Sequence, residues 1–499
     1  MTATLTADRT PVVSTRSQWR GGTVIAAVLV ILSGVVAAQL VPRGPVTTMQ
    51  ALLSMAILLV IGIGAGVATG RRWSALGAPL LFVVTFEVAR LGIVGPTVEA
   101  PRLTSLYGII AFVLGRGIAA VLMLLPLLVG ALIGADLAAR LGRPGARRIA
   151  TAGRVGVVIG LVALLTQGFF IARPASTAEI LGPDGARMPG SVSELITVPI
   201  GGHDQSLLIR GRDTSSPVLL FLHGGPGGTE LGAMRRDTSL EDDFVVVTWD
   251  QRGSGRSYPS LDPTSTLTLD GMVADTIEVT EYLLDRFDEE RIYLVGQSWG
   301  STLGVLAAQE RPDLYSAFVG VGQMVSQRET DVMFWEDTLA WAEGAGDSGL
   351  ARTLRKNGPP PYDDLYEYEP VVGTEHSWND YPGLDLSHEM PGTLFVPEYS
   401  FLDRINAFRG FFDTNATLYP QLQGIDFRVD VPALEVPYVM VIGEHEARGR
   451  AVLAEEWFDL VEAPAKERVV FEGAGHRPNF DDPARFAEVM ASVASRFGG

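Results

Sequence analysis

The segment 291–310, RIYLVGQSWGSTLGVLAAQE, carries the pattern that decides the fold. Its first part, Arg291–Val295, is a short apolar run typical of a buried strand, and Ser301–Glu310 has the apolar spacing of a helix. Between them, residues 296–300 read GQSWG, a Gly-x-Ser-x-Gly sequence. In a strand–turn–helix setting the glycines allow a turn sharp enough to lift the serine hydroxyl above the sheet. The segment therefore predicts that Ser298 is a nucleophile rather than an ordinary turn residue.

Short apolar runs and amphipathic helices alternate from residue 191 onward, which indicates a sheet of mainly parallel strands covered by helices. The expected strands are Glu194–Ile200, Ser206–Arg210, Val218–Leu222, Phe244–Trp249, Arg291–Val295, Ala317–Val321, Tyr438–Ile442 and Arg468–Phe471. We therefore expect an α/β fold with one large open sheet in this half of the chain.

A serine nucleophile needs a base, an acid that orients the base, and donors for the oxyanion. The chain order in this architecture is serine, acid, histidine, so we expect the base to be His476, the last histidine of the chain. It lies in a Gly-Ala-Gly-His loop directly after the final expected strand. The acid is expected at the end of the preceding strand, where Glu444 and Glu446 are both candidates.

The oxyanion donors are expected near the loop that follows Val218–Leu222 and reads HGGPGG at 223–228. Glycine-rich backbone presents N–H groups without side chains in the way, so we assign one donor to Gly225 and the other to the Trp299 N–H. A phosphate-binding loop is the competing interpretation. It is disfavoured because the lysine of a P-loop is missing and no convincing helix follows.

Five apolar stretches before residue 173 are long enough to cross a hydrocarbon core of about 30 Å. They lie near Gly22–Val41, Ala51–Gly70, Ala75–Val94, Leu106–Ala135 and Val155–Ala172. The first exceeds the apolar core of a signal peptide, which has roughly 7–15 residues. The fourth is long for one span and short for two. We therefore expect residues 1–173 to form an all-α transmembrane bundle of about five helices in the lipid bilayer.

Arginine is distributed unevenly between the loops of this half, and arginine in short loops stays on the cytoplasmic side of a membrane. With five spans, one side holds Arg9, Arg16, Arg20, Arg71, Arg72, Arg140, Arg143, Arg147, Arg148 and Arg154, and the other holds only Arg43 and Arg102. We therefore expect a multi-pass protein of the cell membrane with a cytoplasmic N-terminus and an extracytoplasmic C-terminal half.

Three ionisable residues, Glu87, Arg90 and Arg116, lie inside the expected spans. Such residues suggest a functional site in a membrane protein. No chain of acids or histidines accompanies them here, so we interpret them as an Arg–Glu pair that fixes helix packing or extends to the membrane interface. The bundle is then an anchor.

The formal charge of −18 combines a basic half and an acidic half. Residues 1–173 hold 15 Arg, no Lys and four acids, a net charge of +11, which leaves −29 for residues 174–499. An acidic half of this kind excludes a general nucleic-acid binder, because phosphate neutralisation needs a basic surface. The absence of cysteine excludes disulfides, thiolate metal sites and cysteine nucleophiles. We expect neither a metal nor a cofactor.

Three motifs together resemble the α/β-hydrolases of the proline iminopeptidase type. HGGPGG at 223–228, DQRGSGRS at 250–257 and GQSWG at 296–300 match that family's HGGPGG, DQRGxGxS and GxSWG in order. The resemblance covers about residues 191–497 and implies a serine hydrolase with a helical cap after the sixth strand. The expected organisation is a transmembrane region at 1–173, a hydrolase core at 174–323, a helical cap at 324–430 and the rest of the core at 431–499.

The resemblance also bears on the triad acid and on the substrate. The family usually places an aspartate after the glycine of strand seven. Glu446 stands at the matching offset from Gly443, so the resemblance favours it over Glu444. The family binds the substrate's N-terminal amine with cap glutamates, one of them in a Trp-Glu pair similar to residues 335–336. This makes Glu336 the expected substrate-binding acid.

Together these features favour a membrane-anchored aminopeptidase that uses a Ser–His–Glu triad on small peptides or amino-acid derivatives. A carboxylesterase or lipase acting on acyl esters is the second interpretation, favoured by the anchor and by apolar cap residues. A transporter or sensor with a degenerate hydrolase domain would need a broken triad, and the triad residues are present. An epoxide hydrolase or dehalogenase is disfavoured because position 298 is serine.

Overall fold

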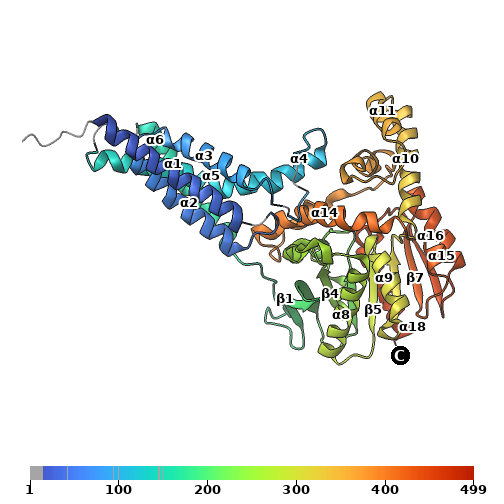
Figure 1. Ribbon diagram of the computed structural model, residues 1–499. Helices are drawn as coiled ribbons and strands as arrows, with labels where there is room; N and C mark the ends of the chain where they lie inside the picture. The colour runs from blue at the N-terminus through green and yellow to red at the C-terminus, as the bar shows by residue number, and fades with distance from the viewer. Residues whose placement is uncertain are drawn as a thin grey trace, which may run out of the picture. The chain divides into compact units, whose positions relative to one another are not determined.

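The computed structural model describes residues 15–41, 43–93, 95–98, 101–143, 146–148 and 150–498, with side chains described for all of these except 15–20 and 388. The chain divides into two compact units (Figure 1). One unit is Met1–Gly95 with Arg116–Arg173, and the other is Pro96–Gly115 with Pro174–Gly499. The second unit thus includes a short segment that the sequence pattern placed in the transmembrane region.

The first unit consists of apolar helices. They are α1 (Thr15–Leu40), α2 (Thr48–Thr69), α3 (Ser74–Ala89), α5 (Ile118–Arg140) and α6 (Thr151–Ala172). Four helices of the described chain are long and apolar enough to cross a membrane: Gly21–Leu40, Thr48–Thr69, Leu106–Arg140 and Thr151–Ala172. The third expected span forms α3, whose 16 residues fall short of the about 20 that a span needs. In place of five long spans, the described chain has four long apolar helices and a shorter one.

The fourth expected stretch forms one helix of 35 residues rather than two helices. It runs through α4 (Leu106–Phe112), the π-helical turn η1 (Val113–Gly117) and α5. The π turn holds Arg116, whose guanidinium donates to the carboxylate of Glu87 at 2.7 Å. Such turns often mark positions where one side chain has a special task. Here that task is an Arg–Glu pair between helices, as the packing interpretation expected.

Small residues bring α2 and α5 into close contact. Gly62 and Gly66 of α2 face Gly130 and Gly134 of α5, and an added Cβ at Gly66 would lie 2.3 Å from the carbonyl oxygen of Ala131. Backbones at this distance leave no room for a side chain. Close approach through small residues is typical of helices that pack within a membrane.

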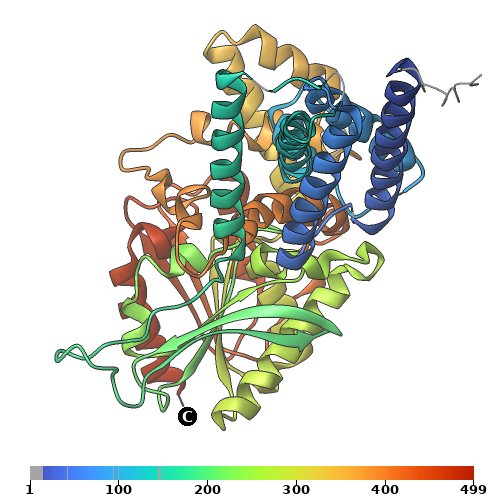
Figure 2. The same cartoon turned by 90° about the vertical axis from the view of Figure 1, so that its left-hand side faces the viewer.

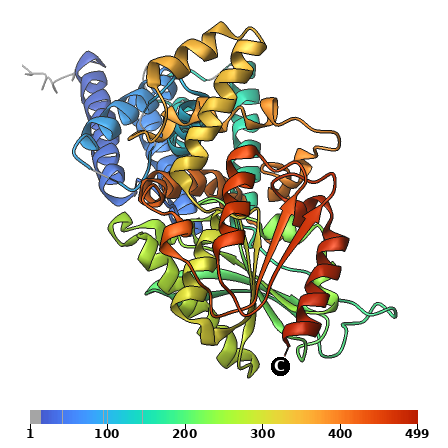
Figure 3. The same cartoon turned by 90° about the vertical axis from the view of Figure 1, so that its right-hand side faces the viewer.

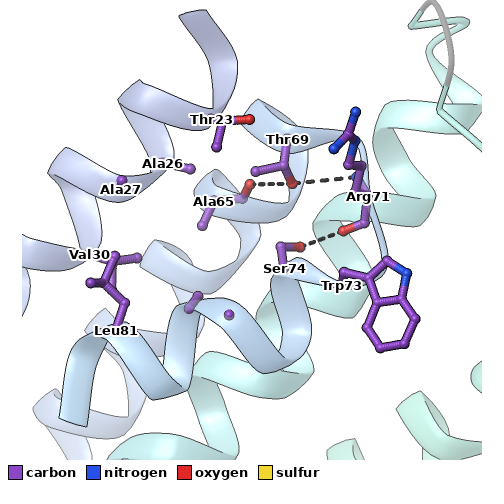
Figure 4. A pocket seen from close by; sticks show the side chains of 12 residues that line it. Thr23, Ala26, Ala27, Val30, Ala65, Thr69, Arg71, Trp73, Ser74 and Leu81 are labelled. Carbon is purple, nitrogen blue, oxygen red and sulfur yellow. Dashed lines mark hydrogen bonds between the residues drawn. The ribbon is translucent and has the colours of Figure 1, made fainter. Parts of the chain in front are cut away.

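A cavity of about 260 Å³ lies among α1, α2 and α3 (Figure 4). Most of its wall is apolar, and its polar groups gather where α2 ends and α3 begins. There the Thr69 hydroxyl donates to the carbonyl of Ala65 at 3.0 Å, and the Ser74 hydroxyl donates to the carbonyl of Arg71 at 2.7 Å. These bonds stabilise the tight connection between the two helices.

The second unit is built on one eight-stranded sheet with the strand order β1-β2-β4-β3-β5-β6-β7-β8. The strands are β1 (Val192–Ile200), β2 (His203–Gly211), β3 (Val218–Leu222), β4 (Val245–Asp250), β5 (Ile292–Gln297), β6 (Tyr315–Val321), β7 (Tyr438–Gly443) and β8 (Lys466–Phe471). Strand β2 is antiparallel to β1 and β4, and β3 to β8 are parallel. All eight expected strands are present within a few residues of their expected bounds, so the expected α/β fold is confirmed.

Helices cover both faces of this sheet (Figures 1 and 3). Side chains of α8 (Leu269–Phe287), α9 (Trp299–Glu310) and α16 (Arg448–Leu460) contribute to one core, and those of α18 (Pro483–Phe497) to the other. The shorter elements of this part are α7 (Leu231–Met234), η2 (Ser239–Asp242), η3 (Gly255–Leu261), η4 (Thr264–Thr266), η5 (Pro312–Leu314) and α17 (Pro478–Asp481). Because the central strands are buried on both faces, their sequences are continuous apolar runs.

A helical insertion, residues 324–430, connects β6 to β7 at the place where the cap was expected. Its elements are α10 (Gln327–Gly344), α11 (Ser348–Asn357), η6 (Leu365–Glu367), α12 (Glu369–Val372), α13 (Glu375–Trp378), η7 (Leu386–His388), η8 (Gly392–Leu394), α14 (Phe401–Leu422) and α15 (Phe427–Asp430). Helix α14 crosses above the strand ends (Figures 1 and 2). An added Cβ at Gly227 would lie 2.5 Å from the carbonyl of Gly410 in α14, so only glycine fits there. Its role as a cap stays a prediction.

The segment Pro96–Gly115 packs on this insertion. The carboxylate of Glu369 accepts hydrogen bonds from the backbone N–H of Leu106 at 2.9 Å and of Tyr107 at 3.2 Å, and from the hydroxyl of Ser105. A carboxylate at this place satisfies N–H groups that have no partner inside the helix. The start of α4 is therefore fixed to the insertion by polar contacts.

Candidate active site

Ser298 stands at a sharp turn between β5 and α9. Its backbone angles, φ 54° and ψ −120°, are rare for a residue with a side chain, and such strain is concentrated at functional sites. Its N–H donates to the carbonyl of Val321 at 2.9 Å, at the end of the neighbouring strand β6. The serine is partly exposed, whereas Gln297 and Trp299 on either side are buried. The expected strand–turn–helix setting is present.

His476 follows β8 and is held by Glu446, which follows β7. Nδ1 of His476 and Oε2 of Glu446 lie 2.7 Å apart. Burial works against ionisation of this carboxyl, but Arg450 and His476 outweigh it and lower the pKa of Glu446 to about 2. An ionised carboxylate at Nδ1 fixes a proton on that nitrogen, which leaves Nε2 able to accept another.

The imidazole lies at the same end of the sheet as the serine. The side-chain amide of Gln297 donates to the carbonyl of His476 at 3.4 Å. An added Cβ at Gly322, which follows Val321, would lie 2.9 Å from Nδ1 of His476. Since Val321 also accepts the Ser298 N–H, the serine and the imidazole are neighbours. The structure brings together the residues expected as nucleophile, base and acid, and their catalytic roles are proposed below.

Glu444, the competing acid, makes different contacts. Its side chain is 54% exposed, and its carboxylate accepts the N–H of Gly473 at 2.9 Å. It lies 4.0 Å from the ring of His445. The described geometry therefore favours Glu446 as the partner of the base.

The two expected oxyanion donors come from two segments that lie next to the serine. An added Cβ at Gly224 would lie 3.4 Å from Cβ of Ser298, which places the HGGPGG loop beside it and Gly225 next in the chain. Trp299 is the first residue of α9, where N–H groups have no acceptor inside the helix. An oxyanion hole needs such unoccupied N–H groups near the nucleophile. Gly225 and Trp299 remain the proposed donors.

The three sequence motifs hydrogen bond to one another. The indole N–H of Trp299 donates to the side chain of Gln251 at 2.9 Å, and the backbone N–H of Gln251 donates to Nε2 of His223 at 3.2 Å. Burial lowers the pKa of His223 to about 4, so its ring stays neutral and accepts this bond. The motifs were visible in the sequence, but this role of His223 and Gln251 was not predicted.

Glu336 lies at the surface of the insertion. Its carboxylate pairs with Arg448 at 3.0 Å, and the two side chains are 54% and 47% exposed. Arg448 also pairs with Asp337 at 2.9 Å. Among the described contacts, none joins Glu336 to Ser298 or His476. Its amine-binding role stays a prediction.

Two acids near His476, Glu230 and Glu389, were not predicted from the sequence as site residues. Glu230 pairs with Arg477, and burial raises the pKa of Glu230 to about 7 despite that arginine. Glu389 interacts electrostatically with His476 and Arg477 and lies 3.6 Å from His376. The sequence could have indicated this pair, because Glu230 closely follows the HGGPGG loop and Arg477 directly follows His476. Among the residues that the structure describes, no three His, Asp or Glu side chains are grouped as a metal site.

Comparisons with known sequences agree with this geometry. The family model for the alpha/beta hydrolase fold matches residues 217–483. The probable aminopeptidase YbaC of Bacillus subtilis is 31% identical over 313 residues, which cover 61% of this chain and 97% of that protein. The probable proline iminopeptidase of Leptolyngbya boryana is 32% identical over 289 residues, which cover 53% of this chain and 83% of the relative.

Solved structures align over nearly their whole length at low similarity. VinJ gives a TM-score of 0.43 at 23% identity and covers 61% of this chain and 99% of its own. The proline iminopeptidase of Mycobacterium smegmatis gives 0.40 at 20% identity, with 61% and 98% covered. The family assignment rests on the sequence matches. The chain belongs to the α/β-hydrolase fold family, in its proline iminopeptidase-like group, and is an enzyme of the serine hydrolase type.

Proposed function

We propose that the protein is a membrane-anchored aminopeptidase with a Ser298–His476–Glu446 triad. The observation that carries this proposal is the 2.7 Å contact between the imidazole and a buried, ionised glutamate, beside a serine on a strained turn. The aminopeptidase and proline iminopeptidase names of the relatives support a hydrolase of the peptidase type.

In the proposed reaction, Oγ of Ser298 attacks the carbonyl carbon of the scissile bond and gives its proton to Nε2 of His476. Glu446 stabilises the imidazolium without taking the proton. The N–H groups of Gly225 and Trp299 bind the oxyanion that develops. The imidazolium then protonates the leaving amine, and a water activated by the same imidazole hydrolyses the acyl-enzyme.

Acidic groups around the site favour a substrate with a positively charged N-terminal amine. Glu389 lies near the loop of His476; burial acts to raise its pKa, but His376 and Arg477 outweigh burial and lower it, and negative charge at a site concentrates cationic substrates. The family resemblance assigns the amine to Glu336, but the described contact of its carboxylate is the exposed pair with Arg448, so this part of the proposal rests on the resemblance alone.

The substrate class can be tested with the full-length protein purified in detergent. We expect aminoacyl-arylamides with a free amine to have kcat/KM at least about tenfold above their N-acetylated forms, because a charged hydrogen bond contributes about 1.5–3 kcal/mol. The Ser298→Ala variant controls for contaminating peptidases. Faster turnover of N-acetylated peptides or of long-chain esters would contradict the aminopeptidase assignment.

The apolar helices support the anchoring part of the proposal. Helix α6 exposes large apolar side chains, with Leu165 73%, Phe169 64% and Ile159 64% exposed. Soluble proteins rarely expose contiguous apolar surfaces of this kind, so we infer that lipid surrounds this helix. The arginine asymmetry favours a cytoplasmic N-terminus and an extracytoplasmic hydrolase unit. Arg9, one of the arginines that this asymmetry counts, lies outside the residues that the structure describes.

The topology depends on whether α3 crosses the membrane. Five crossings put the two ends of the chain on opposite sides, and four put them on the same side. We expect a reporter fused after residue 499 to behave as extracytoplasmic and one fused near Arg143 to behave as cytoplasmic. Cytoplasmic behaviour of the C-terminal fusion would mean an even number of crossings.

A further inference from the structure

Glu446 is one methylene longer than the aspartate that the family usually has, so its carboxylate has one more rotatable bond to restrain. Its two oxygens have separate partners. Oε2 meets Nδ1 of His476 at 2.7 Å, while Oε1 accepts from Nε of Arg450 at 2.7 Å and from the N–H of Ala447 at 2.9 Å. Arg450 is thus the side chain that holds the far oxygen of the carboxylate.

Arg450 is itself buried, with its side chain 7% exposed, and its other donors reach the helical insertion. Both terminal nitrogens bond the carboxylate of Glu375, which is 15% exposed, and the Nη1 bond measures 3.3 Å. The guanidinium carbon lies 4.8 Å from the ring centroid of Phe334. Glu375 opens α13 and Phe334 lies in α10, both in the insertion. Arg450 therefore links the acid of the core to the insertion.

We propose that Arg450 is a positioning residue for the triad and that Glu375 makes its action depend on the insertion. The guanidinium holds Glu446 in the orientation that meets the imidazole, and its positive charge favours the ionised carboxylate. Glu375 fixes the guanidinium and balances its charge. Any displacement of α13 moves Arg450 and so disturbs the acid, which means that the base is correctly held only when the insertion is in place. This inference rests on the proposed triad.

Other titratable and charged groups lie around the loop of His476, and a pH measurement has to take them into account. Glu446 and Glu389 interact with His476 itself; the groups that interact with these two or with the loop are Arg450 after β7, Glu375, His376 and Tyr381 of the insertion, Arg477 of the same loop, Asp481 of α17 and Glu230 after β3. Arg450 and Glu375 have opposite charges. Removing one or the other therefore shifts the protonation of the base in opposite directions.

The test uses the full-length protein and the pH dependence of kcat and kcat/KM. In Arg450→Gln we expect kcat to fall by roughly 10- to 100-fold, because a small misplacement of a reacting group costs about 100-fold. Loss of the positive charge should also move the acid limb of kcat/KM to higher pH by about half a unit or more. Glu375→Gln keeps the size of the side chain and removes a negative charge, so its acid limb should move to lower pH.

Arg450→Lys separates orientation from charge. Lysine keeps the positive charge but cannot bond two carboxylates with a planar fork, so kcat should fall while the acid limb stays in place. Arg448→Gln is the matched control, since Arg448 lies two residues away on α16 with a solvent-exposed pair. Its acid limb should not move, because solvent screens the charge.

Thermal unfolding of each variant shows whether it is folded, and Glu375→Gln gives the answer if Arg450 variants do not fold. Unchanged kcat in folded Arg450→Gln, or acid limbs that move in the same direction in Arg450→Gln and Glu375→Gln, would overturn the inference. Labelling of Ser298 by a fluorophosphonate distinguishes this outcome from failure of the proposed function. If wild-type Ser298 is labelled, only the positioning role is lost; if it is not labelled, the triad itself is wrong.

Discussion

Two acid–arginine pairs flank the loop of His476, and their carboxyl groups behave in opposite ways. Glu446 pairs with Arg450 after β7, and Glu230 pairs with Arg477 on the side of the HGGPGG loop. Burial favours the neutral form of both carboxyl groups. The pKa of Glu446 is nevertheless lowered to about 2, whereas that of Glu230 is raised to about 7.

The number and charge of the neighbours explain this difference. Glu446 receives hydrogen bonds from Arg450, His476 and the backbone of Ala447. Glu230 has Arg477 as its favourable partner, while the nearby acids Glu389 and Asp250 raise its pKa further. One arginine is therefore not enough to keep a buried carboxyl group ionised, whereas several hydrogen-bond donors together are enough. The first region is suited to a permanent charge and the second to a group that titrates near neutral pH.

Among substitutions in the acid–arginine pairs, the largest effect is expected when the permanent charge of Glu446 is removed. Glu446→Gln should lower kcat on the order of 10³- to 10⁴-fold, because an amide cannot stabilise the imidazolium or hold the correct tautomer. Glu444→Gln, two residues away and exposed, should change kcat less than about twofold. Circular dichroism of both variants controls for folding. A larger loss in Glu444→Gln than in Glu446→Gln would transfer the role to Glu444.

An intermediate effect is expected on stability at the second pair. The pKa of Glu230 is raised above the ordinary 4.5, so its contribution to folding is complete below about pH 4.5 and is lost as the pH rises through about 7. At about 1.4 kcal/mol per unit, this amounts to on the order of 3 kcal/mol. We therefore expect Glu230→Gln to remove part of the loss of stability between pH 5 and 7.5, as measured by the unfolding of the hydrolase unit.

The lowered pKa of Glu446 makes stability depend on pH in the opposite direction. Its contribution is present above about pH 4.5 and is lost as the pH falls toward 2, outside the range of this experiment. Parallel stability curves for wild type and Glu230→Gln between pH 5 and 7.5 would show that Glu230 does not titrate there.

The smallest effect is expected at the exposed pair of Glu336 and Arg448. Exposed ion pairs contribute about 0–1 kcal/mol, so Glu336→Gln should change kcat/KM for free-amine substrates less than about threefold. Neutral esters serve as the control substrate. A selective loss of roughly 10- to 150-fold for free-amine substrates would instead support the amine-binding role that the family resemblance assigns to Glu336.

The sequence was sufficient for the sheet and for the turn of Ser298. Strands buried on both faces give apolar runs that can be recognised locally, and GQSWG between such a run and a helical pattern marks the turn. The residues alone left Glu444 and Glu446 both open; the family resemblance favoured Glu446, and the structure places its carboxylate against the imidazole.

Contacts between distant residues could not be predicted in this way. Arg450 and Glu375 are 75 positions apart, and neither has a local pattern that indicates the other. Apolar length alone could not show that 106–140 forms one helix with a π turn at Arg116, because neither the turn nor the pairing of Arg116 with the distant Glu87 has a local pattern in the sequence. The packing of Pro96–Gly115 on the insertion likewise has no local sign in the sequence.

Covalent labelling of Ser298 tests the central claim most directly. A fluorophosphonate probe applied to the full-length protein should modify one peptide, that containing Ser298, as identified by mass spectrometry. The Ser298→Ala variant should show no labelling, and its kcat should fall on the order of 10⁴-fold or more. Equal labelling of wild type and Ser298→Ala, or hydrolysis retained by the variant, would contradict the account.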